Sequence, residues 1–227
     1  RAPLPFAFRY LTAFRQVKKF TVNHDHQKFF LGLRSMTTED FQILIDAYDN
    51  AIAYVDHLVG RIVNFLKKQG LYDNTFIAIL SDHGDNIGDH GLMFHCWCLY
   101  DTLIRIPLLI KYPGDGKLVG RISDVVQNVD LFPTVLSVTG EKDSKILEQY
   151  QGNDLLGELP SRRDPHVAIS ELIKAFGPDS DAYRHLFRQF DRRLLSVRTK
   201  DNKFIYSSRG DHEFYNLQND PKESCNL

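Results

Sequence analysis

Apolar side chains recur at steps of three and four residues between positions 41 and 66, which predicts one face of a long helix. Thr37, with Asp40 three residues later, fits a capping box at the start of this helix. Gly70 fits a stop at its end. The apolar stripe consists of Phe41, Leu44, Ile45, Tyr48, Ile52, Val55, Val59, Ile62 and Leu66.

Two short apolar runs, residues 75–80 and 106–112, lack polar alternation, as expected of strands that are buried on both faces of a sheet. A helix followed by such a strand predicts α/β layering. Residues 125–138 predict another helix, with Pro133 tolerated near its start and Gly140 ending it.

The pattern becomes polar and irregular after position 140. A strand is expected over residues 166–171, and the short runs and turns of residues 194–217 predict an antiparallel meander. We therefore expect an α/β main domain over residues 1–160 and a small antiparallel subdomain over residues 161–227. Residues 1–30 show no sustained period, which predicts an irregular segment.

The charges are nearly balanced and interspersed. The 227 residues carry a formal net charge of -1, which leaves no basic patch of the kind that tracks nucleic-acid phosphates. The apolar runs are shorter than the roughly 18 to 20 residues that cross a bilayer. We therefore expect neither a nucleic-acid partner nor a membrane span, and the compartment stays unknown.

Potential metal ligands directly follow the first apolar run. Asp82 and His83 open a polar loop punctuated by glycines, which allow tight turns of the backbone. A carboxylate and an imidazole are both good ligands of a divalent cation. Because open α/β sheets place ligand sites beyond the carboxyl ends of strands, the pair predicts half of a metal site. The structural alternative is a simple Asp-His-Gly turn.

Four separated stretches resemble the sulfatase family of the alkaline phosphatase superfamily. The first combines a Ser-Asp-His-Gly element with a Gly-Asp-His-Gly element, and the second is a Tyr-Asp run that leads into Arg-Ile-Pro-Leu. A Val-Asp-Leu-Phe-Pro-Thr run and a closing Glu-Phe-Tyr-Asn-Leu run with Asp-Pro-Lys-Glu follow in the family's order. The stretches occupy residues 80–91, 99–110, 129–136 and 213–223.

The resemblance implies an alkaline phosphatase/sulfatase-like sheet flanked by helices, with a small C-terminal antiparallel sheet. It also implies a metal-dependent sulfuric ester hydrolase with one divalent ion, Ca²⁺ being the expected ion and Mn²⁺ or Mg²⁺ the alternatives. Asp82 and His83 would be metal ligands. His95 stands where many family members carry a lysine and would contact the ester, and a histidine could act there as a general acid. His90 would contact the substrate or be structural.

The family's other chemistry is not found in this sequence. Family members carry two metal-binding aspartates near the N-terminus and a Cys/Ser-x-Pro-x-Arg motif, whose first residue becomes the formylglycine nucleophile. No such motif begins at Cys96, Cys98 or Cys225, which are expected to be reduced thiols. We therefore expect these residues to be the C-terminal portion of a longer protein, or to act with a companion chain, and to be inactive alone.

Two other functions fit the sequence. A phosphodiesterase or phosphonate monoester hydrolase of the same superfamily would act on a phosphate or phosphonate ester instead of a sulfate ester. An Asp-x-x-x-His spacing occurs at residues 181–185, after the Ser-Asp-His-Gly element. A two-metal relative would carry this spacing before that element. The position of the spacing here therefore favours a single metal. A non-catalytic, truncated homologue would act as a binding module.

Other polar residues are expected to be structural. Residues 23–26, which contain two histidines and an aspartate, predict a polar surface turn, with metal binding as the weaker alternative. Asp101 and Arg105 stand four residues apart and are expected to form a local ion pair. The carboxylates expected on a solvated helix face are Asp46, Asp49 and Asp56.

Overall fold

A computed structural model describes residues 3, 5–10, 28–29, 31–114, 119–157, 159–162, 164, 166–173 and 187–227. The chain divides into two compact units. Unit 1 contains residues 1–74 and 85–95, and unit 2 contains residues 75–84 and 96–227. Residues 23–26 and 181–185 lie outside the described residues. The domain boundary expected between residues 160 and 161 stays a prediction.

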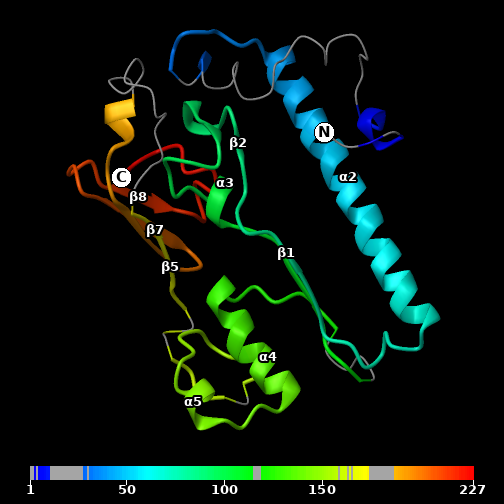
Figure 1. The fold of residues 1–227 in the computed structure, drawn as a ribbon. Helices are drawn as coiled ribbons and strands as arrows, with labels where there is room; N and C mark the ends of the chain where they lie inside the picture. The colour runs from blue at the N-terminus through cyan, green and yellow to red at the C-terminus, as the bar shows by residue number, and fades with distance from the viewer. Residues whose placement is uncertain are drawn as a thin grey trace. The chain divides into compact units, whose positions relative to one another are not determined.

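Unit 1 is built on the long helix α2 (Thr38–Lys68) (Figure 1). The predicted capping box is confirmed: the Asp40 N–H donates to Thr37 Oγ1 at 3.2 Å, and the Thr37 N–H donates to Asp40 Oδ2 at 2.9 Å. Gly70 follows the helix with a φ of 67°, the left-handed conformation that glycine adopts without steric cost.

The face of α2 that is buried within unit 1 differs from the predicted one. Asp46 is 7% exposed and accepts a hydrogen bond from Gln42 at 2.8 Å, so its placement on a solvated face was wrong. The short helix η1 (Phe6–Phe8) lies against α2, and just after it the Tyr10 N–H donates to Asn50 Oδ1 at 3.1 Å. The stripe residues Ile52, Val55 and Ile62 are more than half exposed.

A small hairpin completes unit 1. The strands β2 (Asn86–Ile87) and β3 (Met93–Phe94) pair antiparallel, and η3 (Asp89–Gly91) joins them. Met93 is 2% exposed. The sequence predicted only a loop here, because a strand of two residues is too short to show a period.

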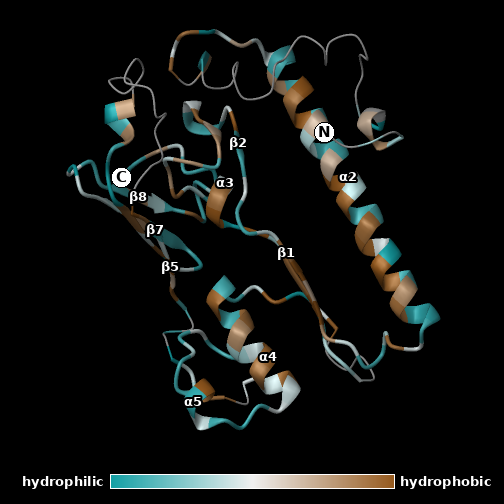
Figure 2. Ribbon diagram, in the orientation of Figure 1, coloured by the Kyte–Doolittle hydropathy of each residue, from teal (hydrophilic) through white to brown (hydrophobic). Residues whose placement is uncertain are grey.

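Unit 2 begins with two paired strands. The strand β1 (Ile77–Leu80) pairs antiparallel with β4 (Leu108–Lys111), which follows the short helix α3 (Asp101–Ile104). Figure 2 shows hydrophobic residues along β1. Both strands were predicted, but burial on both faces was wrong, since Leu80 is 36% and Leu109 is 58% exposed. Among the described residues β4 is the only strand that pairs with β1.

Helix α4 (Leu131–Thr139) begins later than predicted, after the 3-10 turn η4 (Asn128–Asp130), and the short helix α5 (Ser144–Leu147) follows it. Pro133 lies in the first turn of α4, where a backbone N–H has no helical partner to lose. The fully buried Asp130 accepts hydrogen bonds from the N–H groups of Gln127 at 2.7 Å and Asn153 at 2.8 Å. The Val-Asp-Leu-Phe-Pro-Thr run therefore anchors α4.

The C-terminal part of unit 2 is a four-stranded antiparallel sheet in the order β5-β6-β7-β8, which confirms the predicted meander. One core joins Leu194, Ile205 and Tyr215 of the sheet to Leu99, which precedes α3. Before the sheet's second strand, η5 (Arg188–Phe190) stacks Phe190 on Trp97 with ring centroids 5.1 Å apart. The strands are β5 (Ala168–Leu172), β6 (Leu194–Arg198), β7 (Asn202–Ser207) and β8 (Glu213–Asn216).

Among the described residues, no helix has both the length and the apolar character that crossing a membrane requires.

A close backbone contact beside α4 gives a prediction on stability. A Cβ at Gly152 would lie 2.1 Å from the Val129 carbonyl oxygen, a backbone atom that cannot rotate away. We expect Gly152→Ala to lower the free energy of unfolding by about 1–3 kcal/mol, measured by denaturant unfolding. In the matched control Gly60→Ala, the new methyl group meets nothing within 4 Å on a helix, so stability should stay equal or rise. Equal effects of the two changes would contradict the contact.

Candidate metal and ester site

The predicted metal ligands lie directly beyond β1, at the carboxyl end of the strand. Their side chains are exposed, 87% for Asp82 and 43% for His83. Asp82 Oδ1 accepts the His83 backbone N–H at 3.0 Å, and Asp82 Oδ2 lies 3.6 Å from His83 Nε2. A carboxylate oxygen and an imidazole nitrogen therefore converge at the strand end.

The Gly84 carbonyl orients the His83 ring. His83 Nδ1 lies 2.8 Å from the Gly84 oxygen. A carbonyl only accepts, so Nδ1 must carry the proton and donate it. Nε2 of a neutral ring then keeps its lone pair, on the side that faces Asp82. A ring N–H held by a backbone carbonyl is a recurrent support of metal-bound histidines, so this pair fits a divalent cation.

Gly84 is in turn tied to α3. Its N–H donates to the Leu103 carbonyl oxygen at 2.7 Å, and a Cβ at this position would lie only 2.0 Å from the Thr102 carbonyl oxygen. Only glycine fits so close to another backbone segment. The loop that bears Asp82 and His83 is thus fixed by α3 and by β1.

Two ligands do not complete a metal centre. Within the part of the chain that the structure describes, no group of three or more His, Cys, Asp and Glu side chains comes together as a metal site. Catalytic metals generally have three or more protein ligands, so a metal at this pair would need further ligands.

His95, the predicted ester-contacting residue, follows β3 and belongs to unit 1. Its Nδ1 lies 3.4 Å from Asp85 Oδ1, and its side chain is 49% exposed. The sequence interpretation missed Asp85, although a carboxylate directly after the Ser-Asp-His-Gly element was the available signal. The structure thus brings His95 together with Asp85, and Asp82 together with His83, in different units.

His90 lies in η3, is exposed and has a φ of 53°. Left-handed backbone is strained for a residue with a side chain, and such strain gathers at functional sites. Among the described residues, three of the four non-glycine residues with positive φ lie between positions 90 and 97, the others there being Phe94 and Trp97. The segment that carries both histidines is therefore held in an unusual conformation.

Comparison with known proteins gives two family matches. The profile named Sulfatase matches residues 2–141, and the profile described as N-sulphoglucosamine sulphohydrolase, C-terminal, matches residues 88–227.

Individual relatives are similar over most of this chain. An arylsulfatase of Clostridium perfringens is 31% identical over 185 residues, which cover 80% of this chain and 35% of that protein. An N-acetylglucosamine-6-O-sulfatase of Bacteroides thetaiotaomicron is 29% identical over 209 residues, covering 89% of this chain and 35% of that protein. The chain therefore spans about a third of the length of these relatives.

Solved structures share the fold. One is a protein in complex with its substrate D-glucosamine-2-N,6-O-disulfate, with 29% identity and a TM-score of 0.61 over 83% of this chain and 37% of that chain. A phosphonate monoester hydrolase of Agrobacterium radiobacter has 28% identity and a TM-score of 0.65 over 84% of this chain and 38% of that chain.

Proposed function

The chain belongs to the sulfatase family, and we propose that it forms part of a metal-dependent sulfuric ester hydrolase in which Asp82 and His83 bind one divalent cation. The observation that carries this proposal is the convergence of Asp82 Oδ2 and His83 Nε2 at the end of β1, with the ring held by Gly84. The remaining ligands and the nucleophile would come from polypeptide outside these 227 residues, in the same chain or in a companion chain.

A bound cation would supply Lewis-acid stabilisation of the charge that develops on the ester oxygens. The role of this chain is to present the carboxylate and the imidazole in a fixed geometry. We propose that His95 delivers a proton to the leaving oxygen, because Asp85 Oδ1 lies 3.4 Å from its Nδ1 and can orient the ring. His90 would orient the substrate or its own loop.

The choice of ester and the choice of ion are separate parts of the proposal. Similarity to an N-acetylglucosamine-6-O-sulfatase and to a solved structure in complex with a disulfated glucosamine favours a sulfate ester of a sugar. A phosphonate monoester hydrolase is the second candidate, since one is 28% identical to this chain. The resemblance favours Ca²⁺, whereas the nitrogen donor of His83 favours Mn²⁺ over Ca²⁺ and Mg²⁺ by ligand softness.

The proposal is tested with the full-length protein after removal of metal by a chelator. An aryl sulfate and an aryl phosphonate monoester are offered after Ca²⁺, Mn²⁺ or Mg²⁺ is restored. We expect sulfate release that depends on the restored ion. Faster turnover of the phosphonate would favour the second candidate. Turnover of neither ester, combined with absence of metal binding, would favour a non-catalytic binding module.

Replacement of His95 tests its role as general acid. We expect His95→Ala to lower kcat by about 10²–10⁴-fold, since general acid catalysis contributes that much. A general acid acts only in its protonated form, so activity should fall as pH rises. In His95→Lys, which carries the residue common in the family, this fall should move to higher pH because lysine holds its proton longer.

The control for this experiment is His166→Ala, a change at an exposed histidine of unit 2. It should leave both kcat and the pH profile unchanged. An unaltered pH profile in His95→Lys would refute the proton-transfer role.

A further inference from the structure

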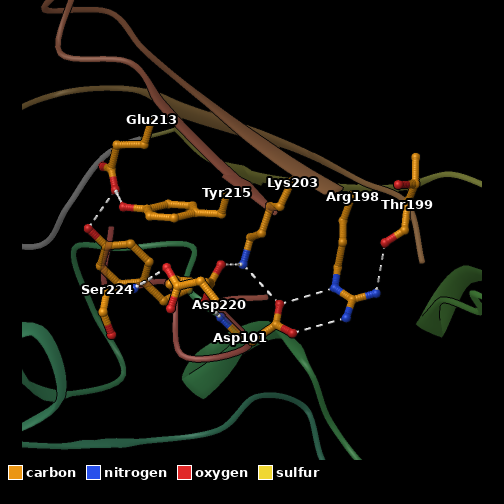
Figure 3. A network of polar contacts seen from close by, with 10 residues as sticks. Asp101, Arg198, Thr199, Lys203, Glu213, Tyr215, Asp220 and Ser224 are labelled. Carbon is orange, nitrogen blue, oxygen red and sulfur yellow. Dashed lines mark hydrogen bonds and ion pairs between the residues drawn. The ribbon is translucent and has the colours of Figure 1, made fainter. Parts of the chain in front are cut away.

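Four charged side chains form a buried ion cluster in unit 2, composed of Asp101, Arg198, Lys203 and Glu223. Figure 3 shows three of them, Asp101, Arg198 and Lys203, with their side chains pointing toward one another. The Lys203 side chain is fully buried, and its Nζ lies 2.6 Å from Glu223 Oε1 and 3.0 Å from Asp101 Oδ1. Arg198 donates to both oxygens of Asp101, at 3.1 Å and 3.0 Å. Two cations and two anions thus balance each other.

The cluster corrects the sequence interpretation of Asp101. A local pair with Arg105 was expected, but the structure pairs Asp101 with residues of β6 and β7 instead. The helix α3 ends at Ile104, and the backbone of Arg105 is no longer helical, so the spacing of four residues does not place the two side chains on one face. Burial alone would raise the pKa of Asp101, but Arg198 and Lys203 outweigh burial and lower it, which keeps the carboxylate ionised.

The cluster also holds the start of α3. Glu223 Oε2 accepts the Asp101 N–H at 2.6 Å, one of the first N–H groups of the helix, which have no partner within it. Beside it, Glu213 Oε2 accepts both the Tyr100 hydroxyl at 2.7 Å and the Tyr215 hydroxyl at 2.5 Å. Two carboxylates from the closing motif of the sequence therefore fix two adjacent residues at the start of α3.

A series of hydrogen bonds connects the cluster, through α3 and Gly84, to the side chain of His83. The helix α3, held at Asp101, presents its Leu103 carbonyl to the Gly84 N–H at 2.7 Å. The Gly84 carbonyl oxygen then accepts the proton on His83 Nδ1 at 2.8 Å. Each of these residues lies in unit 2.

A contribution to folding stability does not by itself explain why these four charged side chains are buried together. Buried ion pairs lose hydration, and apolar residues of similar volume often replace them without loss of stability. Glu223 also has a φ of 55°, a strained conformation for a residue with a side chain. Charged groups do, however, set the position of what they bind more closely than apolar contacts do, because hydrogen bonds are directional.

We propose that Glu223 and Lys203 are positioning residues that act through α3 and Gly84 to hold the His83 ring in its metal-binding orientation. The inference rests on the proposed function, because it assumes that Asp82 and His83 bind the metal. It goes further because it gives Glu223, in the closing motif of the chain, a role in orienting His83, which lies near the start of unit 2.

The test uses the full-length, metal-free protein and the variant Glu223→Gln, well below the unfolding temperature. Mn²⁺ is the probe, titrated calorimetrically. We expect its Kd to rise by about 10- to 100-fold, as for other groups that orient metal ligands. Hydrogen exchange of the Gly84 amide, measured without metal, should become at least about tenfold faster as the contact with Leu103 opens more often. The matched control is Glu148→Gln, at an exposed glutamate.

A double variant separates positioning from stability. Lys203→Met with Glu223→Met removes the buried pair without leaving one charge alone, so most of the melting temperature should be kept. It still lacks the carboxylate that accepts the Asp101 N–H. We expect this double variant to stay folded and still to bind Mn²⁺ more weakly than the unchanged protein does. Recovery of both melting temperature and wild-type Kd would overturn the inference and leave the cluster purely structural.

Asp82→Ala distinguishes failure of the inference from failure of the proposed function. If Asp82→Ala leaves the Kd for Mn²⁺ unchanged, the proposed function is wrong. If Asp82→Ala weakens binding while Glu223→Gln changes neither the Kd nor the exchange of Gly84, only the inference is wrong.

Discussion

If the proposed function is right, replacing Asp82 by alanine should reduce metal binding of the full-length protein below detection and lower its turnover by about 10³-fold or more. A bound metal stabilises the developing charge by several kcal/mol, and each ~1.4 kcal/mol is a factor of ten in rate. Removal of the carboxylate leaves His83 as the sole member of the pair that converges at the end of β1. Metal content by mass spectrometry and steady-state kinetics measure the two effects.

The fold should survive this change. Because the Asp82 side chain is 87% exposed, we expect the free energy of unfolding of the metal-free protein to change by no more than about 0.5 kcal/mol. The matched control Asp191→Ala removes another exposed carboxylate and should alter neither metal content nor turnover. Near-normal turnover of Asp82→Ala under metal-limited conditions would show that the assignment of the ligand is wrong.

Gly84→Ala should disturb the same site without removing either proposed ligand. The added methyl group would lie 2.0 Å from the Thr102 carbonyl oxygen, so the loop and α3 must move apart. We expect the Kd for Mn²⁺ to rise by about 10- to 100-fold through loss of the support to His83. The free energy of unfolding should fall by about 1–3 kcal/mol. Calorimetric titration and denaturant unfolding measure these changes.

The control for Gly84→Ala is Gly120→Ala in the same unit, where a Cβ meets nothing within 4 Å. Neither position has a positive φ, so the comparison isolates the steric effect from any effect of backbone conformation. If both variants bind Mn²⁺ like the unchanged protein, the contact between the loop and α3 does not support the metal ligands.

Sequence reasoning succeeded where the determining interactions are local. The capping box of α2 depends on two residues three positions apart, and the glycine after the helix depends on its own φ. The turns of the C-terminal meander likewise join strands that are adjacent in the sequence, which made their pairing predictable. The placement of Asp82 and His83 after β1 also followed from the order of residues alone.

Sequence reasoning failed where burial or contact depends on how separate segments pack. Asp46 was expected in solvent because helical periodicity identifies an apolar stripe but not which segment covers the opposite face. Asp85 was not singled out, since its proximity to His95 depends on the β2–β3 hairpin, which folds residues 86 and 94 against each other. The closing motif was recognised, but the roles of Glu213 and Glu223 were not.

The sequence by itself determined the family, the long helix α2, the strands β1 and β4, the C-terminal meander and the candidate ligands, because motifs and periodicity are properties of neighbouring residues. Only the tertiary structure decided which groups surround those ligands. Asp101 binds cations 97 and 102 positions later in the chain, and its N–H binds a carboxylate 122 positions later. Such contacts arise when the sheet packs on Leu99 and α3, and burial then makes each charge require a partner.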